Sequence, residues 1–148
     1  MTIEACSRDA AISLVAAAVE KTAVISITSK DEPDVLFPAN KAIEEILRLK
    51  FNDLTEAYDE EGIPYGRPLP GQKDFLGLRA FVDRIQCSRL IVHCWEGVSR
   101  SAAVALAIHQ YRSGGDNLKT SERISPNPLV YALACRELGI RPVNTDHK

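Results

Sequence analysis

The sequence predicts a single α/β domain over residues 1–148, built on a central, mostly parallel sheet of four or five strands flanked by helices. Short apolar runs, such as 23–28 and 90–92, have the length and composition of buried strands. They alternate along the chain with segments whose apolar residues recur at helical spacing. A chain of 148 residues is also long enough to bury one sizeable core.

The first elements are expected to be a helix over Ser7–Lys21, with Ser7 as its N-cap, and a strand over Ala23–Thr28. The apolar stretch Ala10–Val19 is too short to span a bilayer. No basic segment precedes it, so a signal peptide is the less favoured alternative. A turn-rich connection with two prolines then covers residues 29–38.

The next predicted elements are a helix over 39–47, because Ile43, Ile46 and Leu47 have helical spacing, and a short strand over 48–51. A longer apolar stripe predicts a helix over Lys73–Gln86.

The last helix is expected to run from Asn127 or Pro128 to Leu138 and to end at Gly139. Asn as N-cap followed by Pro at the first helical position is a common helix start, so Asn127 is interpreted as structural.

The segment His93–Ser101 contains the residues that most strongly indicate a chemical function. It reads His-Cys-Trp-Glu-Gly-Val-Ser-Arg-Ser and lies between the predicted strand 90–92 and a mostly apolar helical segment, 102–111. A strand, a tight loop and a helix start aim backbone N–H groups at one point, which binds an anion. Positive potential there favours the ionised form of a thiol. The segment therefore predicts a nucleophile in a phosphate-sized cradle.

This run resembles the HCxxGxxR[ST] signature of the cysteine-dependent protein tyrosine phosphatase superfamily, and its second half is most similar to the small dual-specificity branch, of a bacterial type. The resemblance covers most of the chain after about residue 23 and implies a protein tyrosine phosphatase-like sheet flanked by helices. It implies Cys94 as the nucleophile that forms a phosphocysteine. It also implies Arg100 as the bidentate phosphate clamp, a role that Lys would not fill.

The other roles follow from the same resemblance. Ser101 would donate to the sulfur as it leaves, and His93 would fix the loop and help to hold the thiol ionised. Gly97 supplies a position without Cβ, where a positive φ costs little. The loop positions expected to bind phosphate are Trp95, Glu96, Gly97, Val98, Ser99 and Arg100.

A general acid must protonate the leaving oxygen. In the family this Asp follows a strand upstream of the signature, and Asp53 has that position after the predicted strand 48–51. Asp59 and Asp74 compete with it, because the separation from Cys94 is longer than usual. Asp53 could alternatively be a helix N-cap, with Glu56 three residues on.

The irregular stretch Tyr58–Gly71 is interpreted either as a lid or recognition loop or as a solvated connection, with Tyr65 and Arg67 as the first residues to test for substrate contact. Glu96 beside the nucleophile disfavours substrates with several phosphates. Trp95 is expected either at the rim of the pocket or in the core, and the core is the favoured place for a single aromatic residue. The expected substrate is a monophosphate ester, phosphotyrosine first, with phosphoserine, phosphothreonine and small-molecule phosphates open.

Composition limits the remaining possibilities. The net charge of −2 and a pI near 5.9 predict neither nucleic-acid nor membrane binding. The four cysteines have no metal-binding spacing, so neither metal nor cofactor is expected.

Cys87 and Cys94 would lie at opposite ends of a strand, roughly 20 Å apart, which disfavours a disulfide. Thiolate chemistry needs a reducing compartment, so we expect a cytoplasmic protein and, with no sign of a second chain, a monomer.

Two rivals to a phosphatase remain. One is a phosphate-binding pseudophosphatase that keeps Cys94 and Arg100 but lacks a working acid. The other is a thiol-dependent sulfurtransferase or arsenate reductase.

Overall fold

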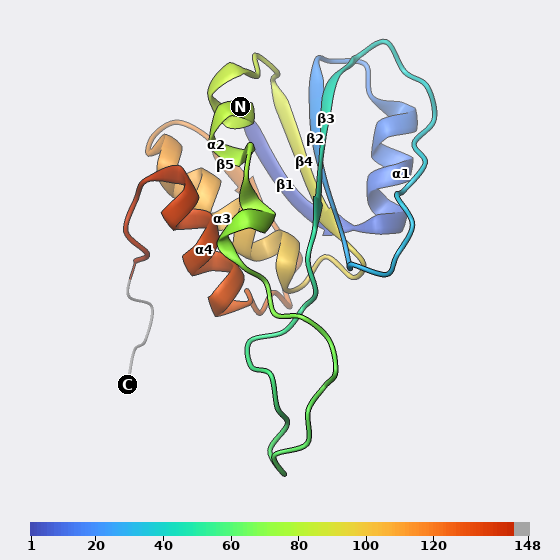
Figure 1. The fold of residues 1–148 in the computed structure, drawn as a ribbon. Coiled ribbons are helices and arrows are strands. Elements are labelled where there is room, and N and C mark those ends of the chain that lie inside the picture. Colours follow the sequence, from blue (N-terminus) through green and yellow to red (C-terminus); the bar gives the residue numbers. More distant parts are fainter. Residues whose placement is uncertain (144–148) are drawn as a thin grey trace.

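Five parallel strands form one sheet in the computed structural model, which describes residues 1–143 (Figure 1). The strand order is β3-β2-β4-β1-β5, and every pairing is parallel. The elements are, in chain order, β1 (Thr2–Ser7), α1 (Arg8–Ala17), β2 (Thr22–Thr28), β3 (Ile43–Lys50), the 3₁₀ helix η1 (Gln72–Phe75), α2 (Leu78–Arg84), β4 (Arg89–Cys94), α3 (Arg100–Arg112), β5 (Asn117–Lys119) and α4 (Pro128–Leu138).

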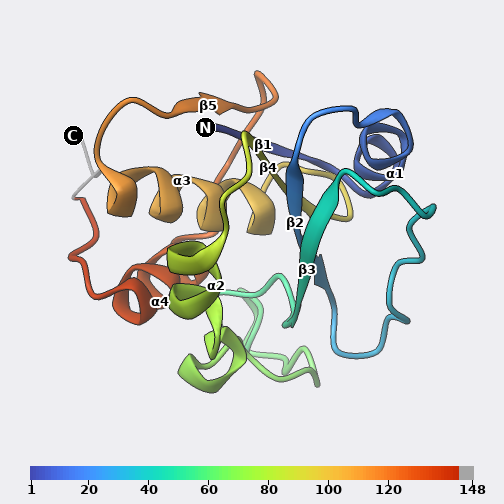
Figure 2. The same ribbon diagram turned by 90° about the horizontal axis from the view of Figure 1, so that it is seen from above.

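Helices cover both faces of the sheet. Viewed from above, α2, α3 and α4 lie on one face and α1 lies on the other (Figure 2). The larger core, with Phe51, Phe75 and Phe81 fully buried, fills the side of the three helices. A smaller cluster around Val15 and Ile91 lies under α1. Strands buried on both faces explain the continuous apolar runs of the sequence, and the predicted α/β architecture is confirmed.

The first predicted helix is shorter than expected, because a strand precedes it. Residues Thr2–Ser7 form β1, which pairs with both β4 and β5. Ser7 is the N-cap, as predicted, and its hydroxyl accepts from the Ala10 N–H at 3.1 Å. In β1 only Ile3 and Ala5 are fully buried, so the strand carries too weak an apolar pattern to be found by sequence. The three-residue strand β5 was missed for the same reason.

The predicted helix over 39–47 is wrong: residues Ile43–Lys50 form strand β3. The register against β2 shifts between Thr22 and Ala23, which places an extra residue in β3. Ile43 and Ile46 consequently pack on the same smaller cluster. A β-bulge therefore produced the spacing that resembled a helix.

The predicted helix over 73–86 is divided into η1 and α2. Gly77, with φ of +89°, lies between them in the left-handed region. The last helix is confirmed, with Asn127 as N-cap, Pro128 at its first position and Gly139 at its C-terminus. Among residues 1–143, no helix combines the length and apolarity needed to cross a bilayer.

Candidate active site

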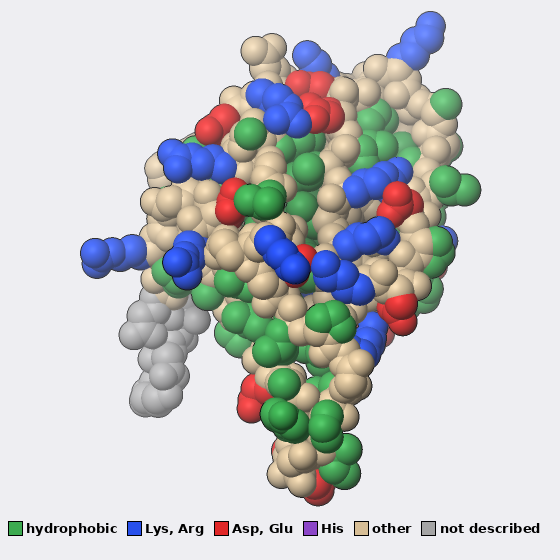
Figure 3. All heavy atoms as spheres, in the orientation of Figure 1, with side chains coloured by type: hydrophobic (Ala, Val, Ile, Leu, Met, Phe, Trp, Pro, Cys, Tyr) green, Lys and Arg blue, Asp and Glu red, His purple; other side chains and the backbone are tan. Residues whose placement is uncertain are grey.

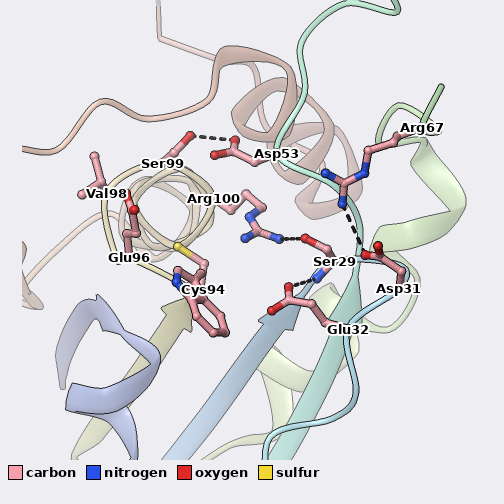
Figure 4. A pocket seen from close by; sticks show the side chains of 11 residues that line it. Ser29, Asp31, Glu32, Asp53, Arg67, Cys94, Glu96, Val98, Ser99 and Arg100 are labelled. Atoms are coloured by element: carbon pink, nitrogen blue, oxygen red, sulfur yellow. Dashed lines mark hydrogen bonds and ion pairs between the residues drawn. The ribbon is translucent and has the colours of Figure 1, made fainter. Parts of the chain in front are cut away.

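The carboxyl ends of the parallel strands meet at one edge of the sheet, where open α/β sheets bind ligands. The loops that follow β2, β3 and β4 border a cavity of about 450 Å³ there. Figure 4 shows its labelled side chains, with the Cys94 sulfur and the Arg100 guanidinium turned towards the same space. The lining residues are Ser29, Asp31, Glu32, Asp53, Arg67, Cys94, Trp95, Glu96, Val98, Ser99 and Arg100.

Cys94 ends β4 and is 3% exposed. Its Sγ accepts a hydrogen bond from the Gly97 backbone N–H at 3.3 Å and lies 3.2 Å from the Ser101 hydroxyl. Helix α3 begins at Arg100, so its N-terminus follows the loop directly. The Gly97 N–H, the Ser101 hydroxyl and the helix start all lie where they would stabilise a negative charge on the sulfur. The structure thus brings together Cys94, Gly97 and Ser101 as the sequence predicts.

The loop between Cys94 and Arg100 is anchored from several parts of the chain. The Arg8 N–H donates to the Trp95 carbonyl at 3.1 Å, and the Ser125 N–H donates to the Val98 carbonyl at 2.9 Å. The Asn127 N–H donates to the Ser99 carbonyl at 3.2 Å. These bonds give the loop one conformation before any ligand arrives, which is the preorganisation that anion binding needs.

Gly97 is fixed both by its backbone angle and by its neighbours. Its φ is +78°, and a Cβ there would lie 2.4 Å from the Cys6 carbonyl carbon and 2.5 Å from the Ser7 nitrogen. Both atoms belong to the backbone at the β1–α1 junction, which cannot turn aside as a side chain could. Gly97 therefore lets the loop between Cys94 and Arg100 pack directly against the backbone at the end of β1.

We expect Gly97→Ala to lower the free energy of unfolding by about 3 kcal/mol or more, from left-handed strain plus the clash with backbone. Gly66→Ala is the matched control, because Gly66 has φ of +70° and open space around it. It should lose only about 1 kcal/mol. Chemical denaturation of both variants measures the difference, and equal losses would contradict the contact with Cys6 and Ser7.

His93 is fully buried behind the loop. Its Nδ1 lies 3.1 Å from the Cys94 carbonyl oxygen, which can only accept, so Nδ1 carries the proton. The Ser26 hydroxyl, 2.6 Å from Nε2, then donates to the other nitrogen of the neutral ring. Burial, with Arg8, Arg100 and Arg48 nearby, lowers the pKa of His93. His93 thus orients the Cys94 backbone as a neutral group.

A lowered pKa makes stability depend on pH. Below about pH 6.5 the unfolded chain binds a proton at His93 that the folded protein does not, so acidification favours unfolding. The wild-type protein should lose at most about 1.4 kcal/mol of unfolding free energy per pH unit from this residue. The difference in unfolding free energy between the wild-type protein and His93→Gln should therefore shrink between pH 7.5 and 5.5, as measured by chemical denaturation. A difference that stays constant would contradict a buried, neutral His93 ring.

Arg100 is 6% exposed and reaches from the start of α3 towards the strand ends. One terminal nitrogen donates to the Ser29 hydroxyl at 3.0 Å and to the Phe51 carbonyl at 3.1 Å. Its Nε is buried and has no hydrogen-bond partner among the described residues. An unpaired buried donor on a charged group is costly, so the side chain is held ready for an anionic ligand.

Asp53 lies across the cavity from Cys94, on the loop after β3. Its Oδ1 accepts from the Ser99 hydroxyl and from the Asn127 side-chain amide, both at 2.8 Å. Both donors act on Oδ1 and leave Oδ2 free of hydrogen bonds among the described residues. The alternative interpretation as a helix N-cap is wrong, because no helix follows Asp53.

The two competing carboxylates have other partners. Asp59 accepts from the Glu61 and Ile63 N–H groups in a turn, and neither it nor Asp74 lines the cavity. Asp74 accepts from the Gly71 N–H at 2.9 Å and pairs with Lys30 at 2.7 Å. Of the three candidates, the geometry therefore favours Asp53.

The long irregular stretch after β3 projects from the body (Figure 1), and hydrophobic side chains gather on it (Figure 3). It folds back on itself through a bridge between Tyr58 and Pro64. Arg67 returns to the cavity rim and donates to Asp31 at 3.3 Å and to Asn52 at 3.2 Å. Tyr65 instead lines a neighbouring cavity that shares Asp53 and Ser99 with the first.

The structure corrects the expected position of Trp95 and adds a second role for Asn127. Trp95 does not pack in the core: its side chain is 57% exposed and lines the cavity. Asn127 caps α4 as predicted but also holds Asp53, a second role that the helix-start pattern did not reveal. Sequence reasoning missed Ser29, although its place directly after strand β2 is a signal that could have found it.

All four cysteines are free. Cys87 precedes β4 and Cys94 ends it, so the strand separates them. Cys6 neighbours His93 in the sheet register and packs with the smaller cluster under α1. Burial, with smaller effects from Glu4 and Cys94, raises the pKa of Cys6 from 9.0 to about 12, so this thiol is a poor nucleophile.

No family model, curated protein or solved structure matches the chain.

Proposed function

We propose that the protein hydrolyses phosphate monoesters, first of all phosphotyrosine in proteins, through a phosphocysteine intermediate. The observation that carries the proposal is the meeting of three groups in one cavity: the Cys94 sulfur among hydrogen-bond donors, the Arg100 guanidinium with an unpaired Nε, and the Asp53 carboxylate. The resemblance of residues 93–101 to the phosphatase signature points to the same chemistry.

In the first step the Cys94 thiolate attacks phosphorus, an S–P bond forms and the P–O bond to the leaving group breaks. Loop N–H groups and Arg100 Nε bind the phosphoryl oxygens, so the unpaired donor gains its partner. The free Oδ2 of Asp53 carries the proton that passes to the leaving oxygen.

In the second step water attacks the phosphocysteine and gives its proton to Asp53. The S–P bond breaks, inorganic phosphate leaves and the thiolate is restored. Ser101, 3.2 Å from the sulfur, donates its hydroxyl proton as a hydrogen bond to the departing thiolate. Each group thereby returns to its starting state.

The charged side chains that line the cavity affect how many phosphates a substrate can carry. Beside Arg67 and Arg100 it is lined by four carboxylates: Asp31, Glu32, Asp53 and Glu96. A second phosphate on the substrate would meet these carboxylates, which supports a monophosphate ester over an inositol polyphosphate. Phosphoserine and phosphothreonine remain possible substrates. A thiolate mechanism needs a reducing compartment, so we place the proposed activity in the cytoplasm of a monomeric enzyme.

The test is phosphate release from phosphotyrosine, phosphoserine, inositol phosphate and nucleotide substrates assayed side by side, with and without EDTA. We expect turnover of the phosphotyrosine peptide that EDTA leaves unchanged, because the proposed chemistry uses no metal. Sulfur transfer from thiosulfate or reduction of arsenate, without phosphate release, would instead favour the sulfurtransferase or reductase. Binding of phosphate without turnover would favour a pseudophosphatase.

A further inference from the structure

The chain's only tryptophan stands directly after the nucleophile and is 57% exposed. Single exposed apolar residues are common on protein surfaces, so exposure alone says little. Trp95, however, lines the same cavity as Cys94 and Arg100. Its indole is therefore an apolar surface next to the reacting sulfur.

The backbone of Trp95 is anchored, and a cation lies against its indole. The Arg8 N–H fixes the Trp95 carbonyl at 3.1 Å, and the Arg8 guanidinium lies over the ring, 5.6 Å from its centroid. Arg8 begins α1, whose N-cap is the Ser7 that Gly97 contacts. A cation over an aromatic face adds attraction to the backbone restraint. Trp95 thus has a defined position before substrate binds.

The remaining wall is mostly polar. Among the described residues that line the cavity, Trp95 is the one aromatic side chain, and Val98 is the other large apolar one. The other lining side chains, apart from Cys94, are hydroxyls, carboxylates and arginines: Ser29, Asp31, Glu32, Asp53, Arg67, Glu96, Ser99 and Arg100. A phosphate ester held on the loop with an apolar leaving group therefore finds its apolar surface at Trp95.

From this arrangement we infer that Trp95 determines specificity by stacking against the ring of an aryl phosphate, above all phosphotyrosine. The inference rests on the proposed function. An aromatic pair in offset or edge-to-face geometry adds attraction beyond area burial. The short methylene of phosphoserine offers no ring, so it gains only the contacts of the phosphate. Trp95 selects among phosphate esters without touching the phosphorus.

The experiment uses the full chain with Cys94→Ser, which binds ligands without turning them over. Because Trp95 is the only tryptophan, its fluorescence reports on this wall directly. We titrate phosphotyrosine, phosphoserine and inorganic phosphate, following fluorescence and, in parallel, calorimetry. Phosphotyrosine should change the fluorescence most and bind about fivefold to tenfold more tightly than phosphoserine.

Calorimetry on Cys94→Ser carrying Trp95→Ala should show this preference lost and inorganic phosphate bound as before. Trp95→Phe should retain most of the preference, because it keeps a ring, whereas Trp95→Leu should not. Tyr58→Ala is the matched control: Tyr58 is also 57% exposed and lies on the projecting loop, away from the cavity. It should change none of the three affinities.

The outcomes separate the two proposals. The stacking role is overturned if Trp95→Ala weakens binding of inorganic phosphate as much as binding of phosphotyrosine. It is also overturned if Trp95→Leu keeps the full preference for phosphotyrosine over phosphoserine. Equal binding of phosphotyrosine and phosphoserine by the parent would also overturn it, while the phosphatase proposal would stand. If the wild-type protein neither binds phosphate nor releases it from any ester, the proposed function itself fails.

Discussion

Cys94→Ser is expected to abolish hydrolysis of phosphotyrosine, by at least about 10⁴-fold, while binding of inorganic phosphate or vanadate persists. A serine hydroxyl at this position is neutral near pH 7 and is a far weaker nucleophile than a thiolate. The donors proposed to hold the anion are unchanged by the substitution, because they are loop N–H groups and the Arg100 guanidinium. A neutral hydroxyl in place of the sulfur does not repel an incoming dianion.

The measurement is steady-state phosphate release together with calorimetric titration of phosphate or vanadate. Cys87→Ser is the matched control, since that sulfur lies before β4 and outside the cavity. It should keep wild-type turnover. Residual turnover by Cys94→Ser would mean that another group is the nucleophile. Loss of phosphate binding would show that the loop needs the sulfur for its shape.

Asp53→Ala should reduce kcat/KM for phosphotyrosine by about 10²–10⁴-fold, the usual contribution of general acid catalysis. The reduction should be smaller for 4-nitrophenyl phosphate, whose leaving group needs less help from a proton. Dependence on the leaving group distinguishes a proton donor from a residue that merely shapes the cavity. Asp53→Asn keeps an oxygen for Ser99 and Asn127 but cannot donate as the acid does, so it should behave like Asp53→Ala.

Asp59→Ala and Asp74→Ala are the comparison variants, because the sequence also offered these two carboxylates as candidates for the general acid. Each accepts backbone N–H groups away from the cavity. Their substitution should lower the free energy of unfolding but should leave the ratio of kcat/KM for phosphotyrosine and 4-nitrophenyl phosphate nearly unchanged. A leaving-group-dependent loss in either variant, with none in the Asp53 variants, would transfer the acid role.

The part of the site that sequence predicted well is local. Cys94, Gly97 and Arg100 lie within one short segment whose loop conformation follows from a strand before it and a helix after it. The buried strands β2 and β4 were equally clear, because central strands of a parallel sheet are apolar on both faces. Nothing distant in sequence was needed to recognise them.

The parts that sequence missed depend on distant partners. Strand β1 is defined by pairing with β4 and β5, which no local pattern encodes. The bulge in β3 imitates helical spacing, and only its register with β2 reveals it. Trp95 was expected in the core on its hydrophobicity, but the loop geometry turns it outward. In each case tertiary contacts overrode a local preference.

The contact between Gly97 and the backbone of Cys6 and Ser7 has a consequence for how the candidate site is assembled during folding. The loop gains its shape only when strand β1 has entered the sheet between β4 and β5, and when the segment around Ser125 has closed on Val98. Contacts between such remote segments carry a loop-closure cost, and folds that depend on them form more slowly than folds with local contacts. The proposed site is therefore assembled from contacts that span the whole chain, and it is complete only in the folded domain.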